Sequence, residues 1–311
     1  MSTGDWIAYW NGHILPDDEI SIAPTDRGFI LGDAAFEAAR TYRHRPFHLD
    51  WHFDRLFTSL EYLRLDPGMS RARLEEVTAD VLDRNRARLR ANDDVSLVHR
   101  VTRGPNAPPY SGIMPGPPTV LITCRPIAFA HFADLYDRGV ELAVPSLKMP
   151  AAGGIDPRIK TQSRLLLALG AVEVGVEARD VLPLFSDVGD YVTESASANV
   201  FFVIDGVLVT APDEAVLGGV TRRVVLRLAE NLGTDVQRRP VHLTELERAT
   251  EAFITATSVA ILPVRRLDGH TLRPIPGELT QRITRAFSHY AGVDIVEQAR
   301  AHLRDAPAVK K

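Results

Sequence analysis

Cysteine is almost absent from this chain, because Cys124 is the only one among 311 residues. A single cysteine cannot form an intramolecular disulfide or build a cysteine-rich zinc site. Long apolar runs are also missing, since no stretch approaches the roughly 18 residues that span a bilayer. The N-terminus lacks the basic start and the apolar core of a secretory signal peptide. We therefore predict a cytoplasmic protein with no membrane partner.

The chain has no excess of positive charge. It carries 36 lysines and arginines against 40 aspartates and glutamates, which gives a net charge of −4. This balance supplies no basic field for nucleic acid, so we predict no nucleic-acid partner. His48 and His52 are four residues apart and could share a metal ion, but no metalloprotease pattern surrounds them. We therefore predict no metal site.

The composition is that of a globular protein, with 45% hydrophobic and 24% charged residues, and the length favours two domains. Asn11-Gly12 predicts a hairpin between two short strands. A strand-like stretch at 34–49 is followed by apolar residues at helical spacing, which predict a helix over 49–63. A second helix is expected after Ser70. Further strands are expected at 94–104 and 118–124, joined by a proline- and glycine-rich loop over 104–118 that we expect to be functional.

The second half is expected to consist mainly of strands. Its patterns predict a strand at 139–149, a helix after Lys160, about four strands at 181–212 with turns at Gly189-Asp190 and Asp205-Gly206, a helix at 218–233 stopped by Gly233, strands at 251–272, and a last helix near 277–291 that closes the chain. Strands grouped with strands, with helices interspersed, indicate an α+β fold. We divide it into a small domain over 1–125, an interdomain linker over 126–134 and a large domain over 135–311.

Two residues are candidates for chemistry. Lys160 precedes an apolar helix, where desolvation favours the neutral amine that a nucleophile requires. Glu194 ends a predicted strand and precedes small residues, so its carboxylate could face a bound heterocycle. Each also has an ordinary explanation, as a solvated lysine and as a glutamate that caps a turn.

Two stretches could bind phosphate. In 217–223, two glycines and Thr221 open a helix, and the first N–H groups of a helix can approach an anion closely. In 253–260, small hydroxyl residues end a strand, and such a turn can present successive N–H groups. Arg55 lies beside the inward stripe of its helix and could add a guanidinium. A threonine-rich turn and a solvated arginine are the ordinary alternatives, but together with the lysine and the carboxylate these features describe a pyridoxal phosphate site.

These motifs resemble those of the class IV, or fold-type IV, aminotransferases, which use pyridoxal phosphate. The likeness covers most of the chain, from GDAAFEAAR and HFDRL through RIKTQSRLLLALGAVE and TESASANVFFV to LGGVTR and FITATSVAILPV. It implies a small α/β domain, a larger β-barrel-like domain with helices, and a homodimer. It also implies that Lys160 is catalytic and forms a Schiff base with the cofactor, and that Glu194 pairs with the pyridine nitrogen. The other implied cofactor contacts are Arg55, Arg164, Asn199, Leu217, Gly219, Val220, Thr221, Ala256 and Thr257.

The resemblance implies transfer of an amino group to a 2-oxo acid such as 2-oxoglutarate or pyruvate. FEAAR is similar to the Phe-Glu-Gly-x-Arg of branched-chain aminotransferases, although those enzymes usually carry a tyrosine where this chain has Arg164. VTRG is similar to the D-amino acid and (R)-amine enzymes, without the Arg-x-His carboxylate trap of the D-specific ones. The expected donor is therefore an apolar L- or D-amino acid or an (R)-amine. KTQSRL is similar to the aminodeoxychorismate lyases, so a lyase that expels pyruvate is the alternative. A non-catalytic phosphate-ligand binding protein is a further one, disfavoured by the lysine and the carboxylate.

The resemblance to the branched-chain enzymes implies that Phe36 faces the substrate pocket. Phe36, Ala38 and Arg40 alternate there, so their side chains project from one face. An arginine on an apolar pocket face is costly unless it is paired. Arg40 is therefore expected either to bind a ligand carboxylate or to form a structural ion pair, and Arg103 is the other candidate for the carboxylate. Thr257 and Ser258 complete the predicted substrate contacts.

Overall fold

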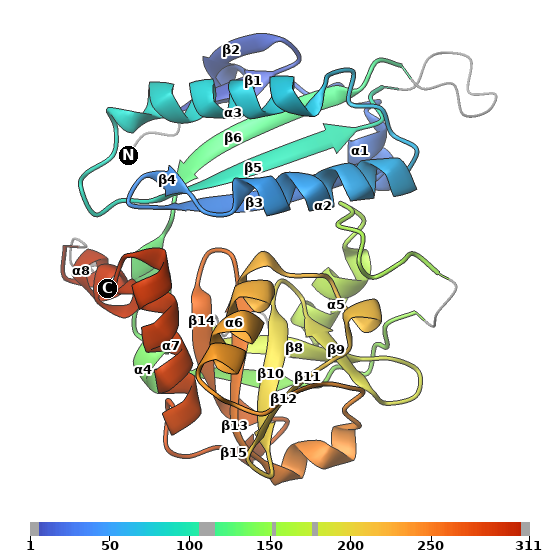
Figure 1. Cartoon of the computed structure of the whole chain (residues 1–311). Helices are drawn as coiled ribbons and strands as arrows, with labels where there is room; N and C mark the ends of the chain where they lie inside the picture. Colours follow the sequence, from blue (N-terminus) through green and yellow to red (C-terminus); the bar gives the residue numbers. More distant parts are fainter. Residues whose placement is uncertain (1–5, 106–115, 151–153, 176–179, 306–311) are drawn as a thin grey trace. The chain divides into compact units, whose positions relative to one another are not determined.

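The structure, a computed structural model, describes residues 6–105, 116–150, 154–175 and 180–305 (Figure 1). By its internal contacts the chain divides into two units. Unit 1 contains Met1–Ile127 and Ile159–Arg164, and unit 2 contains Ala128–Arg158 and Leu165–Lys311. The segment 159–164, which includes Lys160, therefore groups with unit 1 although it lies beyond the predicted linker.

Unit 1 is built on a six-stranded antiparallel sheet in the order β2-β1-β6-β5-β3-β4. The predicted hairpin is confirmed, because Trp10 pairs with His13 and the two turn residues, Asn11 and Gly12, have φ of 45° and 94°. Both residues thus adopt the left-handed conformation that tight hairpin turns require. The strands are β1 (Ile7–Trp10), β2 (His13–Pro16), β3 (Ala34–Tyr42), β4 (Arg45–Pro46), β5 (Val95–Thr102) and β6 (Thr119–Pro126).

Two helices cover one face of this sheet, α2 (Leu49–Tyr62) and α3 (Arg71–Arg86) (Figure 1). Both are confirmed predictions, and Ser70 caps α3 by accepting a hydrogen bond from the Arg73 N–H. The core between the helices and the sheet includes the α3 residues Leu74, Val77, Val81 and Leu82. The short helix α1 (Arg27–Leu31) was not predicted, because five residues are too few to show a helical period.

The strands of unit 1 alternate between the two faces of the sheet. On β5, Val95, Leu97, His99 and Val101 are buried, whereas the residues between them are half-buried. Phe36 is paired with Arg100 across the ladder, Ala38 with Val98, and Arg40 with Ser96. The predicted alternation of Phe36, Ala38 and Arg40 is therefore confirmed, and these residues share a face with Arg100.

Unit 2 contains a nine-stranded sheet that curls toward a half-barrel (Figure 1). Its order is β12-β11-β10-β13-β14-β7-β8-β9, with β15 paired to β14. The predicted meander at 181–212 is confirmed as four strands, with left-handed residues at Asp190, Asp205 and Gly206 in its turns. The strands are β7 (Val140–Ala143), β8 (Val181–Ser186), β9 (Val192–Ser195), β10 (Asn199–Ile204), β11 (Val207–Thr210), β12 (Val236–Arg238), β13 (Ala249–Ala256), β14 (Ala260–Leu267) and β15 (His270–Thr271). The α+β class is thus confirmed.

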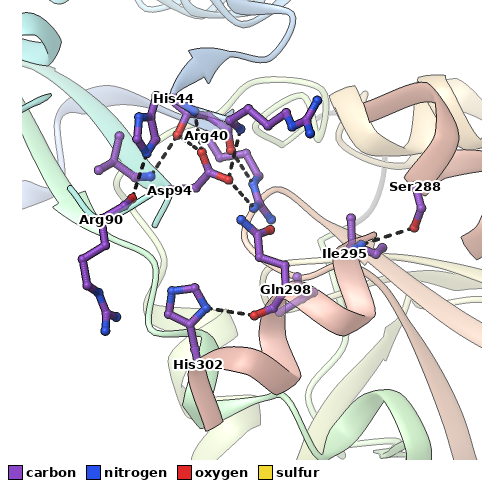
Figure 2. A network of polar contacts seen from close by, with 12 residues as sticks. Arg40, His44, Arg90, Asp94, Ser288, Ile295, Gln298 and His302 are labelled. Carbon is purple, nitrogen blue, oxygen red and sulfur yellow. Dashed lines mark hydrogen bonds and ion pairs between the residues drawn. The ribbon is translucent and has the colours of Figure 1, made fainter. Parts of the chain in front are cut away.

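The main helices of unit 2 are α5 (Leu165–Glu173), α6 (Val220–Asn231), α7 (Glu278–Ala291) and α8 (Ile295–Asp305), and α4 (Leu135–Arg138) is a single turn. The prediction that the helix near 277–291 closes the chain was wrong. Gly292, with φ of 72°, ends α7, and Asp294 then starts α8 by accepting from the N–H groups of Val296 and Glu297. Figure 2 shows the start of α8, where Ser288 accepts from the Ile295 N–H. Short 3₁₀ helices lie at Asp17–Glu19, Phe129–His131, Asp213–Ala215 and Leu243–Arg248.

Two other expectations differ from the structure or lie outside it. The strand predicted at 139–149 is shorter, because β7 ends at Ala143 and Pro145 has no N–H to continue a ladder. Most of the loop predicted at 104–118, residues 106–115, lies outside the described residues. In the part of the chain that the structure describes, no helix combines the length and apolar character needed to cross a membrane.

Candidate active site

Lys160 is held at the edge of β3 by main-chain hydrogen bonds. The Phe36 N–H donates to the Lys160 carbonyl at 3.1 Å, and the Gln162 N–H donates to the Ala34 carbonyl at 2.8 Å. Between them, Ala35 and Thr161 form an antiparallel bridge. The segment therefore extends the sheet of unit 1 by a short stretch, and the backbone of the lysine is fixed by the strand.

A second anchor for the lysine comes from α2. The Ser59 hydroxyl accepts a hydrogen bond from the Lys160 N–H at 3.1 Å and donates one to the Arg55 carbonyl at 2.9 Å. The half-buried side chain reaches back over β3, so that Nζ lies 4.5 Å from the centroid of the Phe36 ring. The Arg164 guanidinium lies 5.5 Å from the same centroid. A phenyl face attracts cations, so this ring helps to place both predicted cofactor contacts.

Arg55 forms a bidentate ion pair with Glu37. Its Nε donates to Glu37 Oε2 at 2.8 Å and its Nη2 donates to Oε1 at 2.7 Å. His52 Nδ1 lies 3.0 Å from the same Oε1. Glu37 was not among the predicted site residues, and the structure pairs its carboxylate with Arg55 and His52.

The charges of this cluster are set by burial and by the ion pair. Burial acts to raise the pKa of Glu37, but the Arg55 guanidinium and the His52 hydrogen bond outweigh it and hold this pKa well below its ordinary range. The pKa of His52 is lowered by burial and, to a smaller extent, by the nearby charges of Arg55 and Lys160, although the Glu37 carboxylate acts to raise it. At neutral pH, Glu37 is therefore an anion and His52 is neutral, with its Nδ1–H donated to the carboxylate.

In unit 2, Glu194 is part of a separate hydrogen-bonded group. Its Oε2 accepts from the Asn199 side-chain amide at 3.3 Å and from the Leu217 N–H at 3.2 Å. The same amide group also donates to the Leu217 carbonyl at 2.9 Å. The half-buried carboxylate is thus oriented by two residues that the resemblance also placed at the cofactor.

The two stretches predicted to bind phosphate meet in unit 2. The Thr221 hydroxyl, in the first turn of α6, donates to the Ala256 carbonyl at the end of β13, at 3.3 Å. Gly219 is the N-cap of α6, with no capping hydrogen bond from a side chain. A Cβ on Gly219 would lie 2.1 Å from the Asn199 Oδ1, so any larger residue there would displace the Asn199 amide. Val220 follows in α6, and Thr257 and Ser258 lie in the turn after β13.

Arg40 occupies the structural ion pair that the sequence left open as its alternative role. Its Nη2 lies 3.9 Å from Asp94 Oδ2, its Nε donates to the Thr41 carbonyl at 3.1 Å, and its Cζ is 3.9 Å from the centroid of the Tyr42 ring. Asp94 also accepts from the Thr41 hydroxyl and from the His44 N–H. Figure 2 shows Arg40 and His44 around this buried carboxylate.

Arg103 is similarly engaged within unit 1. Its Nε and Nη2 donate to the two oxygens of Asp33 at 2.8 and 3.1 Å. The guanidinium also donates to the Leu63 carbonyl at 2.8 Å and to the Arg64 carbonyl at 3.0 Å. Four acceptors thus hold Arg103 in place, and it ties β5 to the end of α2.

Arg100 is a candidate that the sequence analysis missed. Its side chain is half-buried on the face of the sheet that carries Phe36, its direct cross-strand partner. Burial lowers the pKa of the guanidinium. Among the described residues, its guanidinium has no hydrogen-bond or ion-pair acceptor. The alternation of LVHRV could have placed this arginine on one face, but the face itself follows only from the register of β3 and β5.

Other reactive side chains carry no comparable arrangement. Cys124 is buried, and burial raises its pKa to about 12, so its thiol is inert at neutral pH. His48 stacks on Trp51, with 3.8 Å between ring centroids, and His52 faces Glu37. Within the described ranges, no three histidine, cysteine, aspartate or glutamate side chains gather as a metal site.

Comparison with known proteins shows that the chain is an enzyme of the aminotransferase class. Residues 34–267 match the family described as amino-transferase class IV. The branched-chain-amino-acid aminotransferase of Salmonella typhimurium is 30% identical over 296 residues, covering 90% of this chain and 91% of that protein. The D-alanine aminotransferase of Staphylococcus epidermidis is 28% identical over 285 residues, covering 90% and 96%. The chain belongs to the class IV aminotransferase family.

Solved structures agree with this assignment. The branched-chain amino acid aminotransferase of Escherichia coli superposes with a TM-score of 0.77 at 27% identity, covering 90% of this chain and 92% of that one. Another branched-chain amino acid aminotransferase, complexed with N-(5'-phosphopyridoxyl)-L-glutamate, superposes with a TM-score of 0.81 at 25% identity. That superposition covers 92% of this chain and 94% of the other. The expected two-domain architecture of the family is thereby confirmed.

Proposed function

We propose that this aminotransferase binds pyridoxal phosphate through Lys160 and transfers the amino group of an apolar amino acid to a 2-oxo acid. The observation that carries the proposal is the fixing of Lys160 by β3 and by Ser59. A lysine with a fixed backbone and a half-buried side chain can present its amine repeatedly to the same reacting atom. No observation favours the pyruvate-expelling lyase that the sequence left open.

The residues present fit the chemistry of the cofactor. Lys160 supplies an amine for the aldehyde, and Glu194 supplies a carboxylate for the pyridine nitrogen. The start of α6 offers helical N–H groups behind a glycine N-cap, which suits a phosphate. Thr221 and Arg55 add a hydroxyl and a guanidinium. Asn199, Leu217, Gly219, Val220, Ala256 and Thr257 would complete these contacts, with Arg164 near the ring, as the resemblance implies.

Each of these side chains has a defined task. When bound, pyridoxal phosphate withdraws electrons from the Cα–H bond of the amino substrate. Lys160 Nζ would take the proton from Cα of the substrate as a general base. It would then deliver a proton to C4′ of the cofactor as a general acid. The Glu194 carboxylate, oriented by Asn199 and Leu217, would retain a proton on the pyridine nitrogen. Arg55 and Thr221 would hold the phosphate so that the reacting atoms stay aligned.

The substrate carboxylate is assigned to Arg100 in this proposal. Arg40 and Arg103 each have an acidic partner and several acceptors, whereas Arg100 has none among the described residues. A half-buried guanidinium is costly until it is paired, so a ligand carboxylate would stabilise it. Phe36, opposite Arg100 on the same face, would contact an apolar side chain. Thr257 and Ser258 would contribute from the turn after β13.

The names of the relatives support two donor classes. One relative is named for branched-chain amino acids and another for D-alanine. We therefore propose an apolar amino acid as donor, with its handedness decided by experiment, and 2-oxoglutarate or pyruvate as acceptor.

We further propose that the enzyme is a homodimer, as the resemblance implies. Helix α5 exposes Leu165 and Val172, which are 71% and 63% accessible, and α1 exposes Phe29 at 77%. Apolar side chains of this size gather at interfaces between subunits. Light scattering of the purified enzyme tests this proposal, and the mass of a single chain would contradict it.

A donor panel tests the proposed reaction. The holoenzyme is mixed in single turnover with L-leucine, D-alanine or an (R)-amine, without acceptor, and the absorbance of the bound cofactor is followed. We expect at least one amino acid to change the spectrum and the addition of 2-oxoglutarate or pyruvate to restore it. Release of pyruvate from aminodeoxychorismate, without any amino-group transfer, would overturn the proposal.

A further inference from the structure

One stripe of α2 carries polar side chains toward β3 and the Lys160 segment. His52, Arg55 and Ser59 are spaced three and four residues apart, so they lie on one face of the helix. His52 and Ser59 are buried, and Arg55 has a side-chain exposure of 12%. Buried polar residues on a helix that otherwise packs into an apolar core need partners, and all three have them.

Glu37 is the centre of this arrangement. It is fully buried on β3, and its carboxylate accepts from Arg55, from the neighbouring Ala38 N–H at 2.8 Å and from His52. Both oxygens of the carboxylate contact the guanidinium, which fixes the plane of Arg55 as well as its position. Because β3 also holds the Lys160 backbone, this one strand fixes the positions of both Arg55 and Lys160.

We propose that Glu37 is a positioning residue for cofactor binding, which holds the Arg55 guanidinium in the orientation that receives the cofactor phosphate. This inference rests on the proposed role of Arg55. A flexible arginine loses side-chain entropy when it binds an anion, and an arginine already held by a carboxylate loses less. Glu37 touches neither substrate nor cofactor in this arrangement and acts through Arg55.

A purely structural ion pair would have a different signature. It would stabilise unit 1 and would affect all ligands of the enzyme alike. A positioning role affects only ligands that carry the phosphate. Pyridoxal lacks this group but has the same ring and aldehyde, so the ratio of its dissociation constant to that of pyridoxal phosphate isolates the contribution of the phosphate.

The experiment measures this ratio on the full-length protein after removal of its cofactor. Glu37→Gln keeps the volume of the side chain but removes the charge and one acceptor for the guanidinium. We expect this variant to lower the ratio about tenfold through weaker binding of pyridoxal phosphate, with the affinity for pyridoxal unchanged. Arg55→Ala should lower the ratio at least as far, and Glu37→Gln should lower it no further in that background.

Two further variants complete the test. Asp26→Asn also removes a buried carboxylate of unit 1, one that accepts from Thr102, Thr119 and Gly28, and it should leave the ratio unchanged. If Glu37→Gln does not fold, Glu37→Asp retains the charge, withdraws the carboxylate from Arg55 by one methylene and should lower the ratio in the same direction.

The outcomes separate this inference from the function on which it rests. An unchanged ratio in the Glu37 variants, with a lowered ratio in Arg55→Ala, would show that Glu37 is only structural and would overturn the inference. Equal losses for both ligands would overturn it as well. An unchanged ratio in Arg55→Ala would overturn the phosphate role of Arg55 and the inference with it. Failure of the unaltered protein to bind pyridoxal phosphate would instead refute the proposed function.

Discussion

Phe36 and Lys160 are joined twice, through a 3.1 Å hydrogen bond from the Phe36 N–H to the Lys160 carbonyl and through the Phe36 ring, whose centroid lies 4.5 Å from the Lys160 Nζ. The main chain thus fixes where the lysine starts, and the ring lies where its side chain ends. This double contact makes β3 the element that positions both the backbone and the amine of Lys160.

The first prediction concerns covalent attachment to Lys160. Borohydride reduction of the holoenzyme should leave the cofactor bound to the chain after denaturation, and Lys160→Ala should lose all of it. Lys148→Ala is the matched control, because Lys148 is also half-buried but is held by Ser186 and Asp190. Mass spectrometry of the denatured chains measures the result. A reduced adduct of equal yield in Lys160→Ala would exclude this lysine as the point of attachment.

The second prediction concerns Glu194. Glutamine at this position can still accept from Asn199 and Leu217, but it cannot hold a proton on the pyridine nitrogen as an anion does. Glu194→Gln should therefore lower kcat by about 10²-fold, within the range for a misplaced acid–base contribution. The affinity for pyridoxal phosphate should change much less. Steady-state kinetics and a cofactor titration test the prediction, which fails if kcat is unchanged.

The third prediction compares Arg100 with Arg103. Arg100→Leu should raise KM for amino acids and 2-oxo acids at least tenfold, because it removes a charged hydrogen bond of about 1.5–3 kcal/mol to the carboxylate. Carboxylate-free (R)-amines should be almost unaffected in single-turnover half-reactions. Arg103→Leu serves as the comparison, because its partners are Asp33 and two carbonyls. A selective effect of Arg103→Leu, with none for Arg100→Leu, would move the carboxylate contact to Arg103.

Substitution of Arg40 should lower the stability of the protein and leave the KM for carboxylate substrates unchanged. Removing it leaves the buried Asp94 without its guanidinium, which we expect to lower the free energy of unfolding by about 3 kcal/mol. Urea denaturation of Arg40→Leu measures this loss. The sequence also allowed a ligand role, for which a higher KM confined to carboxylate substrates would be the sign. Such a rise, at unchanged stability, would restore that role and contradict the ion-pair explanation.

The fourth prediction follows from His99. This residue is buried beside Thr78, and burial lowers its pKa to about 4 from 6.5. The unfolded chain then takes up a proton between these values and the folded chain does not, so the stability is complete above pH 6.5 and falls as the pH drops toward 4. The loss from pH 7 to pH 5 should be about 2 kcal/mol.

Denaturation at both pH values tests the role of His99. The difference between the two free energies of unfolding should shrink by about 2 kcal/mol in His99→Gln, which has no proton to gain. His270→Asn, which alters an exposed histidine, should keep the difference of the unaltered protein. An unchanged difference in His99→Gln would assign the acid sensitivity to other groups.

The fold was predictable wherever local signals determine it. Asn11-Gly12 marks its hairpin because few residue pairs tolerate two left-handed conformations. Ser70 marks the start of α3 because its hydroxyl satisfies a free N–H. Gly292 carried the same kind of signal for the end of α7, and Asp294 for the start of α8, a helix that the sequence analysis overlooked.

The site was predictable only in part, because its contacts join residues distant in sequence. Glu37 and Arg55 are 18 residues apart, and Ser59 and Lys160 are 101 apart. Residue types and spacing proposed Lys160 and Arg55 as separate candidates. Only the pairing of β3 with residues 159–162, together with the Glu37–Arg55 ion pair, shows that the same strand holds the Lys160 backbone and the Arg55 guanidinium. The exposure of Leu165 and Val172 also could not be predicted, because an apolar period looks the same whether it faces a core or a partner.

The chain crosses between its two units three times, at 127–128, 158–159 and 164–165. Unit 1 is not a continuous piece of polypeptide, so no single cut separates the units with their residues intact. A fragment that stops at Ile127 would keep Arg55 and Glu37 but would lack the lysine and the hydrogen bonds it makes to β3. An exchange of unit 1 between relatives would have to move residues 1–127 and 159–164 together. Gene shuffling at one junction would therefore produce chimeras in which the lysine and the strand that holds it have different origins.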